Sequence, residues 1–409
     1  MKILYFSQFY APETVAAAFR ATDNSRLWQQ SGNEVTVFTG FPNFPKGKIF
    51  DGYTPELLKE ENIEGVRVLR SKLVAAPNTS IVNRLKNYLS YYVYGRVNEI
   101  LQDSKIGKDY DVVLGTSGIV FNALLAYKYA KRHHIPFVLE LRDITYVQMR
   151  ATGTGEDGKA VKVMKALELM LCRKAQKVVV VTQGFKDVLV GEGIPAEKIE
   201  VITNGVDVQP AEGAYDEGKP FKLSYFGTIG KSQNLKDTFW YAETIQKHVP
   251  DAQYLIIGDG AQREEVEACV EEENLSYVSM LPGMPAEDLE KYYRDTQLSI
   301  VILRKSDNFK HTIPSKIFQI MGRGIAIMFI GPDGESAEII RKYKAGIVLT
   351  GTEAEDQVIL DKFFEEPDWR ERLKVMGENG RKAAEENYSR AKLAEQYFTL
   401  LEDAAKVEG

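Results

Sequence analysis

The 409-residue chain is too long for one compact core, so its length predicts two domains. Hydrophobic residues make up 44% of the chain and charged residues 27%, as in soluble globular proteins, and the net charge of −6 argues against a general affinity for nucleic acid. The two cysteines, Cys172 and Cys269, lie far apart, which excludes a disulfide framework and a cysteine-based zinc site.

The chain begins with a short apolar run, Met1 to Phe6, that turns polar at Ser7 and Gln8. This run is too short for a signal peptide and fits a buried first strand. No segment reaches the roughly 20 apolar residues that a membrane-spanning helix needs. We therefore expect a cytoplasmic protein, with peripheral attachment to the inner face of a membrane left open.

Short β-branched runs alternate with helix-length amphipathic segments through the first half of the chain. This alternation predicts βαβ units in a parallel, doubly wound sheet. The predicted strands are Lys2–Phe6, Glu34–Thr39, Val66–Arg70, Asp111–Gly115, Pro136–Glu140, Lys177–Thr182 and Ile199–Ile202, and the predicted helices include Ala16–Gln30, Phe121–His133, Ala160–Ala175 and Gly184–Gly191. Asn204–Asp207 then ends the pattern, and Gln209–Pro220 is predicted to be a linker.

The second half of the chain repeats the alternation. Its predicted strands are Phe221–Phe226, Gln253–Ile257, Tyr277–Met280, Leu298–Leu303, Ile325–Ile330 and Gly346–Leu349. The sequence thus predicts an α/β fold with two doubly wound, Rossmann-like domains facing across a cleft, over residues 1–208 and 209–388. Because open parallel sheets bind ligands beyond the carboxyl ends of their strands, the candidate sites are sought in the turns that follow strands.

In the first half, two strand ends carry polar groups. Thr116 and Ser117 offer hydroxyls after one strand, and Glu140, Arg142 and Asp143 place charge at the end of the next. Charge in a buried strand is costly unless it is paired or used, so these residues form either a structural ion pair or a site in which Asp143 holds a reacting hydroxyl. The sequence Asp109-Tyr110-Asp111 precedes its strand, so we interpret it as a strand entry and not as a metal site.

A helix predicted near residues 81–101 carries an apolar stripe at helical spacing. The stripe contains Ile81, Val82, Leu85, Leu89, Tyr92, Val93, Val97, Ile100 and Leu101. Tyr91 and Tyr94 lie off it, among lysines and arginines. Two interpretations stay open: an amphipathic core helix with a basic solvent face, or tyrosines and cations that meet a membrane or a phosphate-bearing lipid acceptor.

In the second half, three turns after strands suit a nucleotide. Gly227, Thr228, Gly230 and Lys231 form a turn whose backbone can approach a phosphate, although the spacing is neither that of a dinucleotide fingerprint nor that of a P-loop. Asp259 either caps the following helix or accepts a ligand hydroxyl. Main-chain atoms near Met284 can bind a planar base, although a merely rigid loop is the alternative.

The segment from Pro314 to Gly324 is the most informative in the sequence. It predicts a helix start with free backbone N–H groups, to which Ser315 adds a hydroxyl and Lys316 a cation. Gln319 follows one turn later, and Arg304 lies in the charged loop before Pro314. A diphosphate and a sugar hydroxyl pair, the parts of a nucleotide sugar, fit this arrangement, and an ordinary capped core helix is the alternative.

Taken together, these segments resemble a family-4 glycosyltransferase of the GT-B fold, over nearly the whole chain. The resemblance is carried by Glu34–Thr39 after Gly32, Val178–Thr182 with Asn204–Asp207, Gly258–Gly260, and Pro314–Phe318 with Gly324. Glu140–Asp143 and the tyrosine-rich helix are similar to those of bacterial enzymes that build capsule, O-antigen (lipopolysaccharide) or exopolysaccharide repeats.

The resemblance implies retaining transfer of a sugar from a nucleoside diphosphate sugar, the co-substrate, with no cofactor and no essential metal. It implies a C-terminal donor-binding domain and an N-terminal acceptor-binding domain, on which the last helix, about residues 389–409, packs back. The acceptor would be a saccharide, including one linked to a polyprenyl diphosphate. Asp143, Arg142 and Glu140 are the catalytic candidates, and Glu13, Thr116, Ser117, Tyr91 and Tyr94 are the acceptor-binding candidates.

The chain departs from the family pattern at several polar positions. Val15-Ala16-Ala17 stands where a glycine pair is common, and the E-x(7)-E glutamates fall at His311 and Gln319. The usual arginine and lysine fall at Thr228 and Gln233, for which Lys231, Arg304 or Lys316 can substitute. Two rival functions therefore stay open: a non-catalytic binding subunit for a partner transferase, and a nucleotide-sugar epimerase.

Overall fold

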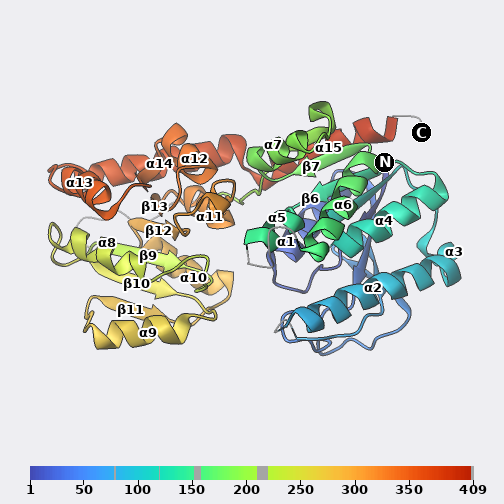
Figure 1. The fold of residues 1–409 in the computed structure, drawn as a ribbon, viewed down its shortest axis with the longest axis horizontal. Helices are drawn as coiled ribbons and strands as arrows, with labels where there is room; N and C mark the ends of the chain where they lie inside the picture. Colours follow the sequence, from blue (N-terminus) through green and yellow to red (C-terminus); the bar gives the residue numbers. More distant parts are fainter. Residues whose placement is uncertain (78–79, 119, 152–157, 210–219, 407–409) are drawn as a thin grey trace. The chain divides into compact units, whose positions relative to one another are not determined.

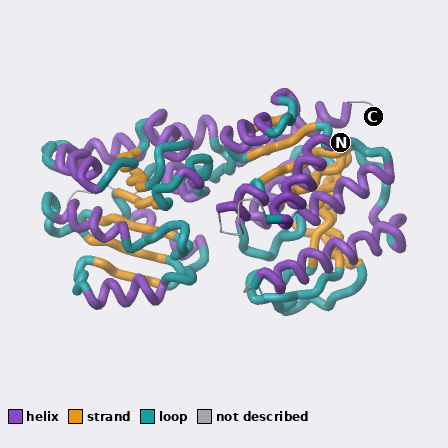
Figure 2. The backbone as a smooth tube through the Cα atoms, viewed as in Figure 1, coloured by secondary structure: helices purple, strands orange, loops and turns teal. Residues whose placement is uncertain are grey.

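The structure is a computed structural model that describes residues 1–77, 80–118, 120–151, 158–209 and 220–406. Its contacts divide the chain into two compact units: unit 1 is Met1–Thr203 with the helix that starts at Arg390, and unit 2 is Asn204–Ser389 (Figure 1). Each unit contains a sheet flanked by helices (Figure 2), so the predicted α/β class with two Rossmann-like folds is confirmed. Most of the predicted linker lies outside the described residues.

Unit 1 is built on an eight-stranded sheet of order β3-β4-β2-β1-β5-β6-β7-β8, parallel except for β3. Its elements are β1 (Lys2–Phe6), α1 (Ala16–Gln30), β2 (Glu34–Gly40), β3 (Leu58–Ile63), β4 (Val66–Ser71), α2 (Ile81–Leu101), α3 (Asp103–Ile106), β5 (Val112–Ser117), α4 (Val120–His133), β6 (Phe137–Leu141), α5 (Thr145–Ala151), α6 (Lys159–Lys174), β7 (Lys177–Val180), α7 (Gln183–Gly191), β8 (Ile199–Val201) and α15 (Arg390–Lys406).

Alternate residues of the unit 1 strands supply two separate cores, one on each face of the sheet. In β1, Leu4 and Phe6 join residues of α2, α4 and α6, whereas Ile3 and Tyr5 join residues of α1 and α15. Side chains alternate along a strand, so a sheet that is buried on both faces needs apolar residues at successive positions. This explains the near-continuous apolar runs in the sequence.

Unit 2 has a six-stranded parallel sheet of order β11-β10-β9-β12-β13-β14. Its elements are β9 (Lys222–Phe226), α8 (Asp237–Gln246), β10 (Gln253–Ile257), α9 (Arg263–Glu272), β11 (Val278–Leu281), α10 (Ala286–Arg294), β12 (Leu298–Ile302), α11 (Ser315–Gly322), β13 (Ala326–Ile330), α12 (Glu335–Tyr343), β14 (Gly346–Leu349), α13 (Glu353–Phe364) and α14 (Trp369–Asn387). The strand order reverses between β9 and β12, which is where doubly wound sheets bind ligands.

The strand β3 and the short helices α3 and α5 were not predicted from the sequence, and one interpretation was wrong. The edge strand β3 (Leu58–Ile63) pairs antiparallel with β4, but its charged sequence and partial exposure gave no strand signal. The short helix α5 follows β6 and was also missed. The core-helix interpretation of α2 fails, because Val82, Leu89 and other members of its apolar stripe are exposed.

The C-terminal helix α15 completes one core of unit 1. The Tyr397 ring meets Trp28 edge-on, with 5.4 Å between ring centroids, and Trp28 Nε1 donates to the Ala394 carbonyl at 2.8 Å. Tyr397 is fully buried, and the Arg20 guanidinium lies 5.8 Å from its ring centroid. A large aromatic side chain thus joins the end of the chain to its first helix.

We predict that Tyr397→Ala lowers the free energy of unfolding of unit 1 by roughly 3–5 kcal/mol, because it removes a buried aromatic ring and leaves a cavity. Urea denaturation measures this change. The matched control is Gln396→Ala, an exposed neighbour on the same helix, which we expect to stay within about 0.5 kcal/mol of the wild type. Equal stability of the two variants would show that α15 contributes little to the core.

Candidate active site

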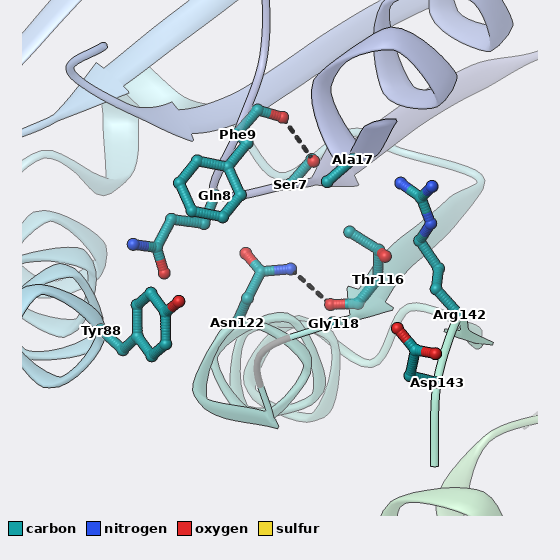
Figure 3. Close-up of a pocket in the computed structure, with 10 residues that line it drawn as sticks. All are labelled: Ser7, Gln8, Phe9, Ala17, Tyr88, Thr116, Gly118, Asn122, Arg142 and Asp143. Atoms are coloured by element: carbon teal, nitrogen blue, oxygen red, sulfur yellow. Dashed lines mark hydrogen bonds between the residues drawn. The ribbon is translucent and has the colours of Figure 1, made fainter. Parts of the chain in front are cut away.

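Unit 1 has a pocket of about 240 Å³ at the carboxyl ends of β1, β5 and β6 (Figure 3). Helices α2 and α4 supply Tyr88 and Asn122 to its wall. The lining residues are Ser7, Gln8, Phe9, Ala17, Tyr88, Thr116, Gly118, Asn122, Arg142 and Asp143. The pocket thus lies beyond the carboxyl ends of strands, where the candidate sites were sought. Three predicted residues, Thr116, Arg142 and Asp143, line it together.

Polar groups point into this pocket from its buried wall. Asn122 Nδ2 donates to the carbonyls of Phe6 at 2.9 Å and Thr116 at 2.8 Å, which fixes its amide between two strand ends. Gln8 is 3% exposed, and its Oε1 has no hydrogen-bond partner among the described residues. A buried acceptor without a partner is costly, so a donor such as a sugar hydroxyl would stabilise it.

Arg142 and Asp143 are the charged groups of the pocket. Burial lowers the pKa of Arg142, although the nearby Glu140 carboxylate opposes this change. Burial raises the pKa of Asp143, although Arg142 and a hydrogen bond from Gln148 oppose that rise. The Asp143 side chain is also open to solvent, which limits the shift. Its carboxyl oxygens can accept a hydrogen bond from a ligand hydroxyl.

Glu140 does not line the pocket, because its side chain is fully buried in a structural network. Arg20 Nε donates to Glu140 Oε1 at 2.7 Å, and Tyr5 Oη donates to Oε2 at 3.3 Å. Burial acts to raise the pKa of Glu140, but Arg20 and Arg142 outweigh it, so the pKa is lowered. Arg20 also donates to the carbonyls of Ile202 and Thr203. Glu140 therefore holds Arg20 in place, and its charge acts on Arg142 through space.

The four remaining acceptor candidates lie behind or beside the pocket. Glu13 is buried and accepts from the backbone N–H groups of Tyr10, Asn43 and Phe44, which ties two loops together. Tyr91 is fully buried, and its hydroxyl donates to Asn122 Oδ1 at 3.1 Å. Ser117 is buried, and Tyr94 lies outside the lining, with Lys72 Nζ 5.5 Å from its ring centroid.

The sequence also missed lining residues. Ser7 and Gln8 directly follow the first strand, so a search of the turn after that strand would have identified them. Tyr88 and Asn122 project from helices, and their meeting with β5 and β6 depends on the tertiary fold, for which the sequence gave no signal. The Asp109-Tyr110-Asp111 sequence directly precedes β5, as expected of a strand entry, and Asp109 pairs with Lys2 at 2.6 Å.

In unit 2, Lys316 lies across the turn that follows β9. Its Nζ donates to Tyr225 Oη at 2.8 Å and stands 4.1 Å from the centroid of that ring. Tyr225 Oη in turn donates to the Thr228 carbonyl at 2.5 Å. Burial lowers the pKa of Lys316 to about 7, and no carboxylate within the described part of the chain forms an ion pair with it. An ammonium without a carboxylate partner is stabilised when an anion binds next to it.

The glycines of unit 2 allow backbones and side chains to approach closely. Gly227 has φ +127°, and a Cβ there would stand 2.4 Å from Lys316 Cε. A Cβ on Gly258 would stand 1.8 Å from the Gly227 carbonyl oxygen, and Ile229 N donates to the Asp259 carbonyl at 2.9 Å. The turns after β9 and β10 are therefore packed against each other, and only glycine fits at their contact.

Asp259 and Met284 belong to neighbouring turns. The Asp259 side chain is exposed and reaches the turn that contains Met284, since a Cβ on Gly283 would stand 2.6 Å from Asp259 Oδ2. Arg263, which the sequence did not single out, donates to the Gly258 and Leu281 carbonyls and lies 3.7 Å from Asp259 Oδ1. These contacts hold the ends of β10 and β11 together.

The other donor candidates lie around the start of α11. Arg304 N donates to the Ser232 carbonyl at 3.0 Å, which joins the loop after β12 to the turn that contains Gly230 and Lys231. Ser315 is the first residue of α11, and the structure describes no side-chain cap for this helix. Thr228, Lys231, Arg304 and Ser315 are exposed, and Gln319 is half-buried.

His311 and Gln319 occupy the two positions of the E-x(7)-E glutamates and lie before and after the start of α11. Gln319 follows it by one turn, and His311 Nδ1 lies 3.2 Å from Glu335 Oε1. A carboxylate from α12 therefore stands beside the first position. Among the described residues, no cluster of three His, Cys, Asp or Glu side chains is arranged to hold a metal ion.

Both halves of the chain match family models of glycosyltransferases. Residues 18–210 match the model described as Glycosyltransferase Family 4, and residues 211–383 match that of Glycosyl transferases group 1. A curated relative, Uncharacterized glycosyltransferase MJ1069 of Methanocaldococcus jannaschii, is 19% identical, and the alignment covers 98% of each chain.

Solved structures share the fold at low sequence identity. Sucrose-phosphate synthase from Thermosynechococcus elongatus has a TM-score of 0.73 at 14% identity, with 98% of each chain covered. HepE from Anabaena in complex with UDP has a TM-score of 0.67 at 14% identity, with 98% of this chain and 100% of that chain covered.

We predict that Gly227→Ala destabilises unit 2 by about 1–3 kcal/mol, because alanine strains a backbone at positive φ and its methyl group collides with Lys316. Chemical denaturation measures the change. Gly191→Ala is the control, since nothing lies within 4 Å of a Cβ at that position. A Gly227→Ala protein as stable as this control would contradict the close packing of Lys316 on the turn.

Proposed function

The chain belongs to the glycosyltransferases of the GT-B fold, and we propose that it transfers a sugar from a nucleoside diphosphate sugar to an acceptor hydroxyl, with retention at the anomeric carbon. The observation that carries this proposal is the half-buried ammonium of Lys316, which has no carboxylate partner among the described residues, beside the Gly227 turn and the start of α11. A diphosphate supplies the negative charge that this position lacks.

We assign the donor to unit 2. The diphosphate rests on the first N–H groups of α11 and on Ser315 and Lys316, while Lys231 and Arg304 offset the charge of the leaving group. Gly227, Thr228 and Gly230 let the backbone approach the phosphates. Lysines and arginines serve here in place of a metal ion.

The rest of the donor meets the neighbouring turns of unit 2. Gln319 binds the ribose, main-chain atoms near Met284 bind the base, and Asp259 accepts a hydroxyl. The His311–Glu335 pair brings a carboxylate to the sugar end. These contacts suit a hexose or an N-acetylhexosamine. The UDP complex of HepE makes UDP the first nucleotide to test.

We assign the acceptor to the pocket of unit 1. Asp143 accepts a hydrogen bond from the reacting hydroxyl, Arg142 orients it, and Thr116 and Gln8 bind neighbouring hydroxyls. Glu140 acts through Arg142 and Arg20 as a positioning residue. In a retaining reaction the hydroxyl approaches from the leaving-group side, so a phosphate oxygen of the departing diphosphate takes its proton.

A lipid-linked saccharide is the acceptor class that we favour, in the synthesis of a surface polysaccharide such as capsule or lipopolysaccharide. The resemblance of Glu140–Asp143 and the tyrosine-rich helix α2 to bacterial enzymes of this kind supports this choice. The structure has no helix, in the part that it describes, that is long and apolar enough to cross a membrane.

The proposed donor site makes nucleotide affinity depend on pH. Lys316 has a pKa of about 7, and a bound diphosphate favours its charged form, so binding takes up a proton above pH 7. We predict that the Kd for UDP rises as the pH goes from 7 to 8.5, by up to about tenfold per pH unit. Isothermal titration calorimetry measures both the Kd and the proton uptake.

Two variants sharpen this test. Lys316→Gln should bind UDP weakly at every pH, and Lys316→Arg should lose the pH dependence because arginine stays charged. Lys362→Gln, at an exposed position on α13, is the control and should behave as the wild type. If no nucleoside diphosphate binds to the wild type, the donor site is wrong.

Asp143→Ala should lower kcat by about a hundredfold or more, because the acceptor hydroxyl loses its oriented partner, while the Kd for UDP stays unchanged. Transfer to a polyprenyl-diphosphate saccharide, followed by mass spectrometry over a panel of nucleotide sugars, measures the rate. Asp51→Ala, an exposed carboxylate of the same unit, is the control.

Three other outcomes would contradict parts of the proposal. Transfer by Asp143→Ala at the wild-type rate removes that residue from the mechanism. Tight UDP binding without transfer to any acceptor favours the non-catalytic binding subunit. Conversion of the nucleotide sugar to its epimer favours the epimerase.

A further inference from the structure

Helix α2 turns an apolar face outward from unit 1. Val82 is 64% exposed, Leu85 48%, Leu89 43%, Val93 49% and Ile100 60%. At about 100° per residue these five side chains fall within a sector of about 80° along about five turns. We call these five residues the apolar face. Such a continuous stripe differs from single exposed apolar residues, which are common on protein surfaces.

The opposite side of α2 is polar and buried, which fixes the rotation of the helix. Asn87 Nδ2 donates to Asn43 Oδ1 at 2.9 Å and to the Val74 carbonyl at 3.1 Å. Asn98 Nδ2 donates to the Leu57 carbonyl at 2.9 Å and to Ser71 Oγ at 2.9 Å. The amide nitrogens of Asn87 and Asn98 are each bonded twice, so the outward apolar groups result from a specific packing arrangement.

A close helix–helix contact supports the same orientation. Helix α2 packs against α4 (Figure 1), and a Cβ on Gly95 would stand 2.4 Å from Leu125 Cδ2. Tyr91, on the same inward side, is fully buried. Rotating α2 to bury its apolar face would break this contact and the bonds of Asn87 and Asn98 together.

The charges of α2 favour an anionic surface. Lys86 is exposed near the first turns, about 20° beyond Val93 at the edge of the apolar face, whereas the exposed Arg84 lies on the opposite side of the helix. The one acidic residue of the helix, Glu99, is 1% exposed and hydrogen-bonds to Arg96. The exposed surface of α2 is therefore apolar and positive, in a chain whose net charge is −6.

Helix α2 also reaches the acceptor pocket. Tyr88 lines that pocket, and Asn87 Oδ1 accepts from Gln8 Nε2 at 2.7 Å, beside the Gln8 oxygen that lacks a partner. One helix thus carries an outward apolar face on one side and pocket residues on the other. Anything bound to the apolar face would lie one helix diameter from the pocket.

We propose that α2 docks unit 1 on a lipid bilayer that contains anionic lipids, with the apolar face in the acyl–headgroup boundary and Lys86, at the edge of that face, at the phosphates. A second copy of this chain fits less well, because a two-fold contact would place two basic faces against each other. The role of this contact in presenting a lipid-linked acceptor rests on the proposed function, whereas the docking itself does not.

Co-sedimentation with vesicles tests the docking. The full chain should sediment with vesicles of 70% phosphatidylcholine and 30% phosphatidylglycerol, and binding should fall with pure phosphatidylcholine and with added salt. Leu85→Gln/Leu89→Gln/Val93→Gln should reduce the partition coefficient by at least about tenfold. Lys86→Gln alone should reduce it by about fivefold.

The control is Val358→Gln/Ile359→Gln/Val375→Gln, which changes three similarly exposed apolar residues of unit 2 and should leave vesicle binding unchanged. Equal sedimentation of the two triple variants would overturn the proposal, as would a wild type that stays in the supernatant. A wild-type dimer that the α2 variant dissociates would assign the face to a second copy and also overturn it.

UDP binding separates this inference from the proposed function. The α2 variant should keep the wild-type Kd for UDP, which shows that it is folded, and lose only vesicle binding. Vesicle binding without UDP binding would leave the docking standing and contradict the transferase. UDP binding without vesicle binding would contradict the docking and leave the transferase proposal standing.

Discussion

The donor site that we propose in unit 2 depends on one half-buried cation. Lys316 projects from the first turn of α11, and its ammonium is held by the hydroxyl and the ring of Tyr225 instead of by a carboxylate. Burial without an ionised partner costs free energy, which the lowered pKa expresses. The glycine at position 227 is required because the lysine side chain occupies the space of a Cβ. The Gly227 turn, the Tyr225 hydroxyl and the α11 start therefore form the single arrangement to which we assign the donor diphosphate.

In unit 1, by contrast with Lys316, a buried carboxylate is paired with an arginine. Glu140 and Arg20 form a fully satisfied pair beneath β6, so that their charges cancel inside the sheet, while Arg142 and Asp143 reach the pocket. The same network contacts Tyr5 of β1 and the carbonyls after β8. The pocket is thus placed by a buried ion pair that joins the strands beneath it, which suits a site that must hold a hydroxyl in one orientation.

The sequence predicted the layers and the strand ends well, because periodic apolar runs and strand-end polarity are local signals. It correctly indicated Thr116, Arg142 and Asp143 as neighbours. It could not show that Glu140 is buried in an ion pair while Asp143 lines the pocket. That difference depends on which face of β6 each side chain takes and on the position of Arg20 in the fold. It also identified the stripe on α2 but could not determine its direction, because Asn87 and Asn98 find their partners on distant strands and loops. Glu335 is likewise near His311 only in the folded protein.

The most direct measurement of the central claim is an NMR titration of the Lys316 ammonium in the free protein and with saturating UDP. The account predicts a pKa near 7 in the free protein and a clear rise once the diphosphate is bound, since the anion stabilises the charged form. An unchanged Lys316 pKa under saturating UDP would place the nucleotide elsewhere and contradict the account.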